Sequence, residues 1–165
     1  MVDSALSMGG FTALHLGLKH PHRTMSLTLA GTGYGAERHL EADFRAACIA
    51  VAETFETEGA AVFASAYAEG ASRVQFLAKD PRGWQEFAYR LATHSDFGSA
   101  LTMRGVQAHR ESLWNMETDL RQLRLPVLIL VGDEDDHCLQ PGLFLKRTIP
   151  TAGHRVVARR PGVHG

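Results

Sequence analysis

The chain has 165 residues, of which 45% are hydrophobic and 21% charged, a composition typical of a globular domain and not of a disordered segment. It carries 17 Lys and Arg against 18 Asp and Glu, for a formal net charge of −1. That balance provides no basic surface for nucleic acid or anionic lipid, so neither is expected as a partner.

The two cysteines, Cys48 and Cys138, lie far apart and form no Cys-x-x-Cys pair, which indicates neither a disulfide framework nor a zinc site. The chain starts with Met1-Val2-Asp3, acidic where a signal peptide is basic. No apolar run approaches the ~20 residues that a membrane span needs. We therefore expect a cytoplasmic protein with no membrane contact.

Residues 1–35 predict a helix followed by a strand. Phe11, Leu14 and Leu18 recur at i, i+3 and i+7, which indicates a helix that ends before Pro21. Ser26–Ala30 then reads as a short buried strand, and a glycine-rich loop closes it.

The sequence pattern of residues 36–122 predicts several helices and no strand, and Asp80 followed by Pro81 predicts a helix start. In residues 123–165 the apolar run 126–131 predicts a strand buried on both faces, followed by a turn, a short helix over 141–148 and a weaker strand over 154–158. Strands separated by helices indicate an α/β fold with a short parallel sheet of about three strands.

The strongest chemical signal is Ala5-Leu6-Ser7-Met8-Gly9-Gly10. A serine in a small-x-Ser-x-Gly setting that opens into a helix is a variant of the nucleophile elbow, where a sharp turn exposes the hydroxyl. The small residues relieve the clash between strand and helix, and the Met8 N–H at the helix start can stabilise an oxyanion. The alternative interpretation is an ordinary flexible turn or helix start.

Acidic residues follow the apolar strand in Gly132-Asp133-Glu134-Asp135-Asp136, at the strand end where α/β sheets place their active sites. Without other signals, these acidic residues would be interpreted as a solvated turn. A histidine later in the chain completes the order Ser, Asp, His of a hydrolase triad. His164 follows the last predicted strand and is the favoured base, whereas His154 stands at the start of that strand and should lie at the opposite edge. His164 could equally be frayed tail.

These motifs resemble the α/β-hydrolase superfamily, in particular its lid-bearing esterase, lactonase and haloperoxidase-like branch. The resemblance implies a partial α/β-hydrolase fold: residues 1–35 and 123–165 form the hydrolase core, and 36–122 an inserted helical cap or lid. It further implies that Ser7 is the nucleophile, Asp135 the acid that orients the base, His164 the general base and Met8 an oxyanion-hole donor.

The sequence also departs from the family pattern. Only six residues precede Ser7, so we expect the strand that feeds the elbow to be missing, together with the loop that supplies a second oxyanion donor. Val163 separates His164 from the usual preceding glycine, and no closing helix follows. The chain therefore resembles the C-terminal part of such an enzyme, truncated at both ends.

The sequence predicts a serine hydrolase that acts on a small ester, lactone or related acyl substrate through an acyl-enzyme, without a cofactor. Hydrolysis of a C–C bond and acyl transfer use the same triad and stay open. The alternative from another class is a non-catalytic fragment or interaction module of hydrolase ancestry. The sequence leaves the oligomeric state open.

Two weaker features point to ordinary structure. His15, His20 and His22 could suggest a metal cluster, but no carboxylate or cysteine joins them at ligand spacing, so surface histidines and no metal are expected. A set of large side chains could line a substrate pocket, but helical spacing more often marks core; these are Trp84, Phe87, Trp114 and Met116.

Overall fold

The computed structural model describes residues 2–158, so His164 lies outside the described residues. The chain divides into two compact units, one made of Met1–Glu41 with Glu111–Gly165 and the other of Ala42–Arg110. The second unit is shorter than the predicted segment 36–122, because buried side chains of residues 113–123 belong to the core of the first unit.

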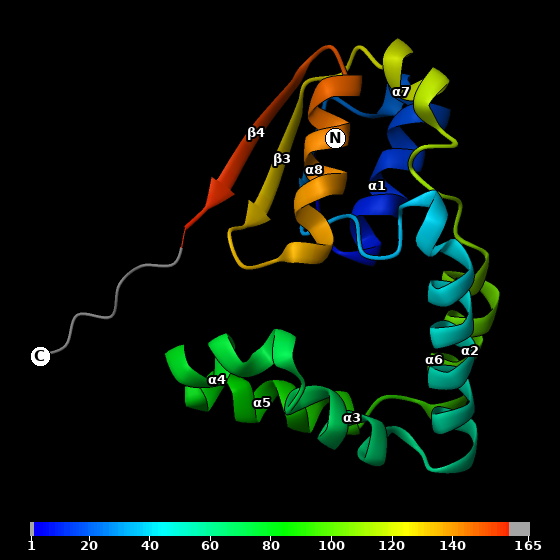
Figure 1. Ribbon diagram of the computed structural model, residues 1–165, viewed down its shortest axis with the longest axis vertical. Helices are drawn as coiled ribbons and strands as arrows, with labels where there is room; N and C mark the ends of the chain where they lie inside the picture. The colour runs from blue at the N-terminus through cyan, green and yellow to red at the C-terminus, as the bar shows by residue number, and fades with distance from the viewer. Residues whose placement is uncertain (1, 159–165) are drawn as a thin grey trace, which may run out of the picture. The chain divides into compact units, whose positions relative to one another are not determined.

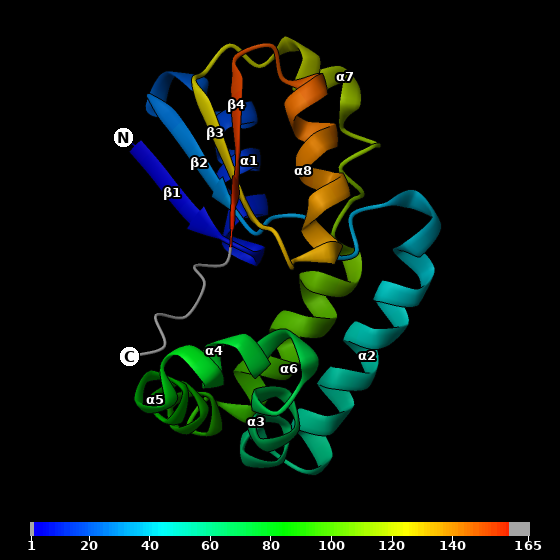
Figure 2. The same cartoon turned by 60° about the vertical axis from the view of Figure 1, so that its left-hand side comes forward.

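The first unit is a parallel sheet with helices packed against it (Figures 1 and 2). In chain order its elements are β1 (Val2–Leu6), α1 (Met8–Lys19), β2 (Ser26–Ala30), α7 (Glu117–Gln122), β3 (Val127–Gly132), α8 (Asp136–Thr148) and β4 (Ala152–Val157), with short 3-10 helices at Pro21–Arg23 and Arg38–Leu40. The four strands lie in the order β1-β2-β3-β4. α1 packs against β1 and β2, and α8 against β3 and β4, on the same face of the sheet (Figure 2).

β1 corrects the prediction that the strand before the elbow is missing. Val2–Leu6 pairs in parallel with Ser26–Ala30 in a register that joins Leu6 to Ala30. The five residues contain no apolar run or strict alternation, so no local pattern marks a strand. It forms because β2 offers an edge for backbone hydrogen bonds, which depends on tertiary context. Within residues 2–158 the sheet has four strands, where about three were expected, and a strand leads into Ser7.

Two other boundaries differ from the prediction. α8 begins at Asp136, five residues before Pro141, which lies inside the helix. The Asp135 carbonyl accepts the N–H groups of Cys138 and Leu139 and so starts the first turn ahead of the proline. β4 begins two residues earlier than predicted, because Ala152 and Gly153 pair with the start of β3.

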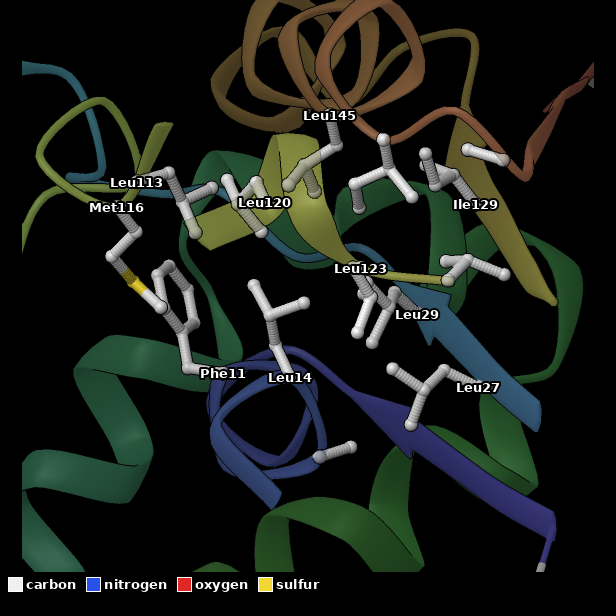
Figure 3. Close-up of a cluster of buried hydrophobic side chains, with 14 of the residues drawn as sticks. Phe11, Leu14, Leu27, Leu29, Leu113, Met116, Leu120, Leu123, Ile129 and Leu145 are labelled. Atoms are coloured by element: carbon white, nitrogen blue, oxygen red, sulfur yellow. The ribbon is translucent and has the colours of Figure 1, made fainter. Parts of the chain in front are cut away.

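The core of the first unit lies between the sheet and its helices (Figure 3). Its side chains come from α1, the two central strands, residues 113–123 and α8. Figure 3 labels Phe11, Leu14, Leu27, Leu29, Leu113, Met116, Leu120, Leu123, Ile129 and Leu145. Burying one such side chain contributes ~1.5–3 kcal/mol, so this cluster is the main attraction between strands and helices.

The second unit is helical throughout, as predicted for this part of the chain. Its helices are α2 (Glu41–Thr57), α3 (Ala60–Ala68), α4 (Val74–Lys79), α5 (Pro81–Ala92) and α6 (Asp96–Gly105), with short 3-10 helices at Ala71–Arg73 and Gln107–His109. Asp80 caps α5, because its Oδ1 accepts the Gly83 N–H at 2.9 Å. A role of this unit as a lid stays a prediction. None of the helices within residues 2–158 has the length and apolar character that a bilayer crossing needs.

The approach of α1 to the loop after β2 predicts a difference between two adjacent glycines. A Cβ on Gly10 would lie 1.9 Å from Thr32 Oγ1 and 3.0 Å from Thr32 Cβ, whereas a Cβ on Gly9 would meet Ala5 Cβ at 3.5 Å, an ordinary contact. We expect Gly10→Ala to lower the free energy of unfolding by about 1–3 kcal/mol through overpacking.

Urea unfolding of both variants is the measurement. Gly9→Ala is the matched control and should leave stability unchanged or raise it, since alanine favours the helix by up to ~1 kcal/mol. Equal effects of the two substitutions would contradict the packing of Gly10 against Thr32.

Candidate functional site

Ser7 forms the junction between β1 and α1, and its backbone has a conformation that residues other than glycine rarely adopt. Its φ of 54° and ψ of −119° make it the one non-glycine residue with positive φ among residues 2–158. Its N–H donates to the Ala30 carbonyl at 2.8 Å, and its own carbonyl accepts the Gly10 N–H at 2.9 Å. Such strain costs about 1–3 kcal/mol and persists only where the surroundings fix it, which is common at functional sites.

Small residues on both sides of the junction let the strand and the helix approach each other. A Cβ on Gly9 would touch Ala5, and Gly10 packs directly on Thr32. Met8 is the first residue of α1, so its N–H has no hydrogen-bond acceptor within the helix. The exposed Ser7 side chain therefore stands at a helix N-terminus, where developing negative charge is favoured.

Asp135 lies in the turn after β3 and comes close to the end of β2. A Cβ on Gly31 would lie 3.5 Å from Asp135 Oδ2 and 3.6 Å from Leu6 Cδ1. The Asp135 carboxylate and the residue that precedes Ser7 thus flank the same glycine. Gly31 has a φ of 50°, a conformation that favours glycine, and so turns the chain beside the Asp135 carboxylate. Ser7 and Asp135 consequently follow parallel strands at one edge of the sheet.

The two candidate histidines lie in different places. His164 is outside the described residues. His154 lies inside β4, opposite Ile129 of β3, and not at the start of the strand as predicted. Its Nε2 is buried with no hydrogen-bond partner within residues 2–158, at 3.2 Å from the Cβ position of Gly142 in α8. His154 is therefore a sheet residue packed under α8, away from the strand ends.

Sequence reasoning missed a ring pair at the same edge of the sheet. Tyr34, in the loop after β2, and His137, in the first turn of α8, have ring centroids 4.4 Å apart and planes inclined by 50°. The only available signal was an aromatic residue inside the glycine-rich loop 31–35. The pairing depends on the packing of that loop against α8, which no local pattern indicates.

The side chains of the weaker features contribute mainly to packing. Met116 is buried in the core of the first unit, and Trp114 stacks on Phe144 with ring centroids 4.2 Å apart. In the second unit the Trp84 indole N–H donates to the Ala68 carbonyl at 2.9 Å, and Phe87 contacts neighbouring rings. In the part of the chain that is described, no three His, Cys, Asp or Glu residues are grouped so as to hold a metal ion.

A cavity of about 590 Å³ lies along the second half of α1, away from Ser7 and Asp135. Among its lining residues are His15, Lys19, Glu111 and Arg124. Burial lowers the pKa of His15 below the usual 6.5, and the charge of Lys19 lowers it further, while Glu111 acts in the opposite direction. Because the cavity lies beyond the far half of the helix that starts at Ser7, it is not part of the candidate active site.

The chain matches a protein family over almost all of its described length. The family model described as "Serine aminopeptidase, S33" matches residues 3–158. No curated protein matches the chain in a comparison of sequences.

Solved structures share the fold at low sequence identity. The structure of MenH from S. aureus has a TM-score of 0.85 and 19% identity, with 95% of this chain and 59% of that chain covered. A thermophilic esterase from Thermogutta terrifontis has a TM-score of 0.78 and 23% identity, with 96% and 56% covered. The enol-lactonase from Burkholderia xenovorans LB400 has a TM-score of 0.76 and 19% identity, with 93% of this chain and 55% of that chain covered. The chain thus spans somewhat more than half the length of these structures, which show the fold alone.

The strained conformation of Ser7 predicts that glycine is more stable than alanine at this position. Glycine adopts positive φ without a Cβ penalty, so Ser7→Gly should relieve the strain, whereas Ser7→Ala removes the hydroxyl and keeps it. We expect Ser7→Gly to be more stable than Ser7→Ala by about 1 kcal/mol in urea unfolding. The reverse order would show that the junction is unstrained.

The lowered pKa of His15 predicts a pH dependence of stability. Below about pH 6.5 the unfolded chain binds a proton at His15 more readily than the folded chain, so stability declines as the pH falls. We expect His15→Gln to show a smaller decline than the parent in unfolding curves between pH 7 and pH 5. His20→Gln, at an exposed position on the same segment, is the control. Parallel curves for the parent and His15→Gln would contradict the burial of this imidazole.

Proposed function

The chain belongs to the serine aminopeptidase S33 family of α/β-hydrolases, and from this premise we propose that it is a serine hydrolase of a small ester, lactone or related acyl substrate. The observation that carries the proposal is the conformation of Ser7. A positive φ at a non-glycine residue, between a strand and the helix it feeds, is the geometry of a nucleophile elbow. A surface turn without a function has no need of this strain.

In the proposed mechanism the Ser7 hydroxyl attacks the substrate carbonyl while His164 takes its proton. The Met8 N–H stabilises the oxyanion that forms. His164 then donates the proton to the leaving oxygen, which departs and leaves an acyl group on Ser7. Water, activated by the same imidazole, cleaves this ester and regenerates the hydroxyl. No step needs a cofactor.

Asp135 is proposed to hold the imidazole of His164 in the correct tautomer. Its place beside Gly31, at the edge where Ser7 lies, supports this role. The proposal for His164 rests on chain order and on the end of β4: the Asp133 N–H donates to the Val157 carbonyl at 3.1 Å, so β4 ends beside the acidic loop. β4 therefore ends at the edge of the sheet where Ser7 and Asp135 lie.

Covalent labelling with a fluorophosphonate, measured by intact mass, tests the proposal. The parent should gain one adduct and Ser7→Ala none. Ser4→Ala, at an exposed serine in β1, the strand before Ser7, is the matched control and should label like the parent. Asp135→Asn and His164→Gln should slow labelling by about 100-fold or more, as expected when general-base catalysis is lost. His154→Gln should not.

Either of two results would overturn this assignment. A folded parent that takes no label would favour the non-catalytic alternative. An adduct that persists in Ser7→Ala would place the nucleophile elsewhere.

A further inference from the structure

Tyr34 and His137 place an aromatic surface at the carboxyl edge of the sheet. Their ring centroids are 4.4 Å apart, and His137 lies two residues after Asp135 in the first turn of α8. Tyr34 is 52% exposed, and His137 is also exposed. The pair therefore keeps ring surface open to a ligand.

Contacts other than this ring pair already hold the loop after β2. On one side Thr32 packs against Gly10, where a Cβ would lie 1.9 Å from Thr32 Oγ1. On the other side Gly33 packs against Pro141, where a Cβ would lie 2.4 Å from the proline Cβ. Neither glycine has room for a side chain, so the loop is clamped between the starts of α1 and α8.

The end of the loop is anchored as well. Ala36 is fully buried, and its carbonyl accepts the Ser112 hydroxyl at 2.6 Å and the Leu113 N–H at 3.2 Å. Fixed at Gly33 and at Ala36, the loop holds the Tyr34 backbone in place without help from the ring. An exposed ring on a rigid loop is suited to contact a ligand.

The ring pair and the proposed catalytic groups share one edge of the sheet. The Ser7 N–H donates to the carbonyl of Ala30, directly before the loop, and the Asp135 carboxylate lies beside Gly31. Tyr34 follows Ala30 by four residues, and His137 follows Asp135 by two. The ring pair therefore lies on the two segments that leave the strand ends beside Ser7 and Asp135.

We propose that Tyr34 and His137 form a subsite for an aromatic ring of the substrate, so that arylalkyl esters are preferred to esters with a saturated ring of equal size. The inference rests on the proposed function of Ser7 and specifies the substrate class. Offset or tilted ring contacts favour an aromatic over an aliphatic partner by about 2- to 10-fold.

Hydrolysis of benzyl acetate and cyclohexylmethyl acetate tests the preference, since the two alcohols are similar leaving groups. The ratio of kcat/KM for the two esters should exceed one in the parent and fall by about 2- to 10-fold in Tyr34→Leu, mainly through KM. Tyr34→Phe keeps the ring and should keep the ratio. A ratio that is equal in the parent, Tyr34→Leu and His137→Gln would overturn the subsite.

Binding of unreactive amides separates this inference from the proposed function. N-Benzylacetamide should shift the ring resonances of Tyr34 and His137 in a saturable way, and N-(cyclohexylmethyl)acetamide should do so more weakly. This result together with an unlabelled Ser7 would refute the hydrolase and support the subsite. A labelled Ser7 with equal binding of the two amides would refute the subsite alone.

Discussion

The turn at Ser7 is the constraint on which the rest of the site depends. The chain must leave β1 and enter α1 within one residue, which forces that residue into a strained conformation. The strain is held by two backbone hydrogen bonds and by the close approach of Gly10 to Thr32. Because the helix starts immediately after the serine, the same turn exposes the hydroxyl and brings N–H groups to it. Structure and proposed chemistry therefore come from a single backbone requirement.

The turn also determines how the neighbouring loops are arranged. Packing on Gly10 fixes Thr32, and so fixes the direction in which the chain leaves β2. Gly33 leaves space for Pro141, and the positive φ of Gly31 turns the chain beside Asp135. Three parallel strands thus deliver Ser7, the glycine-rich loop and the acidic turn to one edge, where side chains distant in the sequence become neighbours. The glycines serve this close approach, and not flexibility.

Much of the fold could be predicted from local patterns. The helix after Ser7, the strand Ser26–Ala30 and the cap at Asp80 each carry a signal within a few residues. β1 could not be predicted, because its strand character comes from pairing with β2. The predicted start of β4 was wrong for the same reason. Gly153 on its own indicates a turn, and only its pairing with β3 makes it part of the strand. Long-range pairing, and not propensity, determines these elements.

The same division applies to the candidate site. Ser7 and Asp135 can be proposed from sequence because a nucleophile and an acid require particular residue types in a particular order. Tyr34 and His137 carry no such requirement, and their pairing depends on how the loop after β2 meets α8. Residues that perform the chemistry are restricted by that chemistry, whereas residues that contact the variable part of a substrate are restricted only by the shape around them. For the proposed hydrolase, substrate choice is therefore to be sought in the packing of the loops and not in the motifs of the sequence.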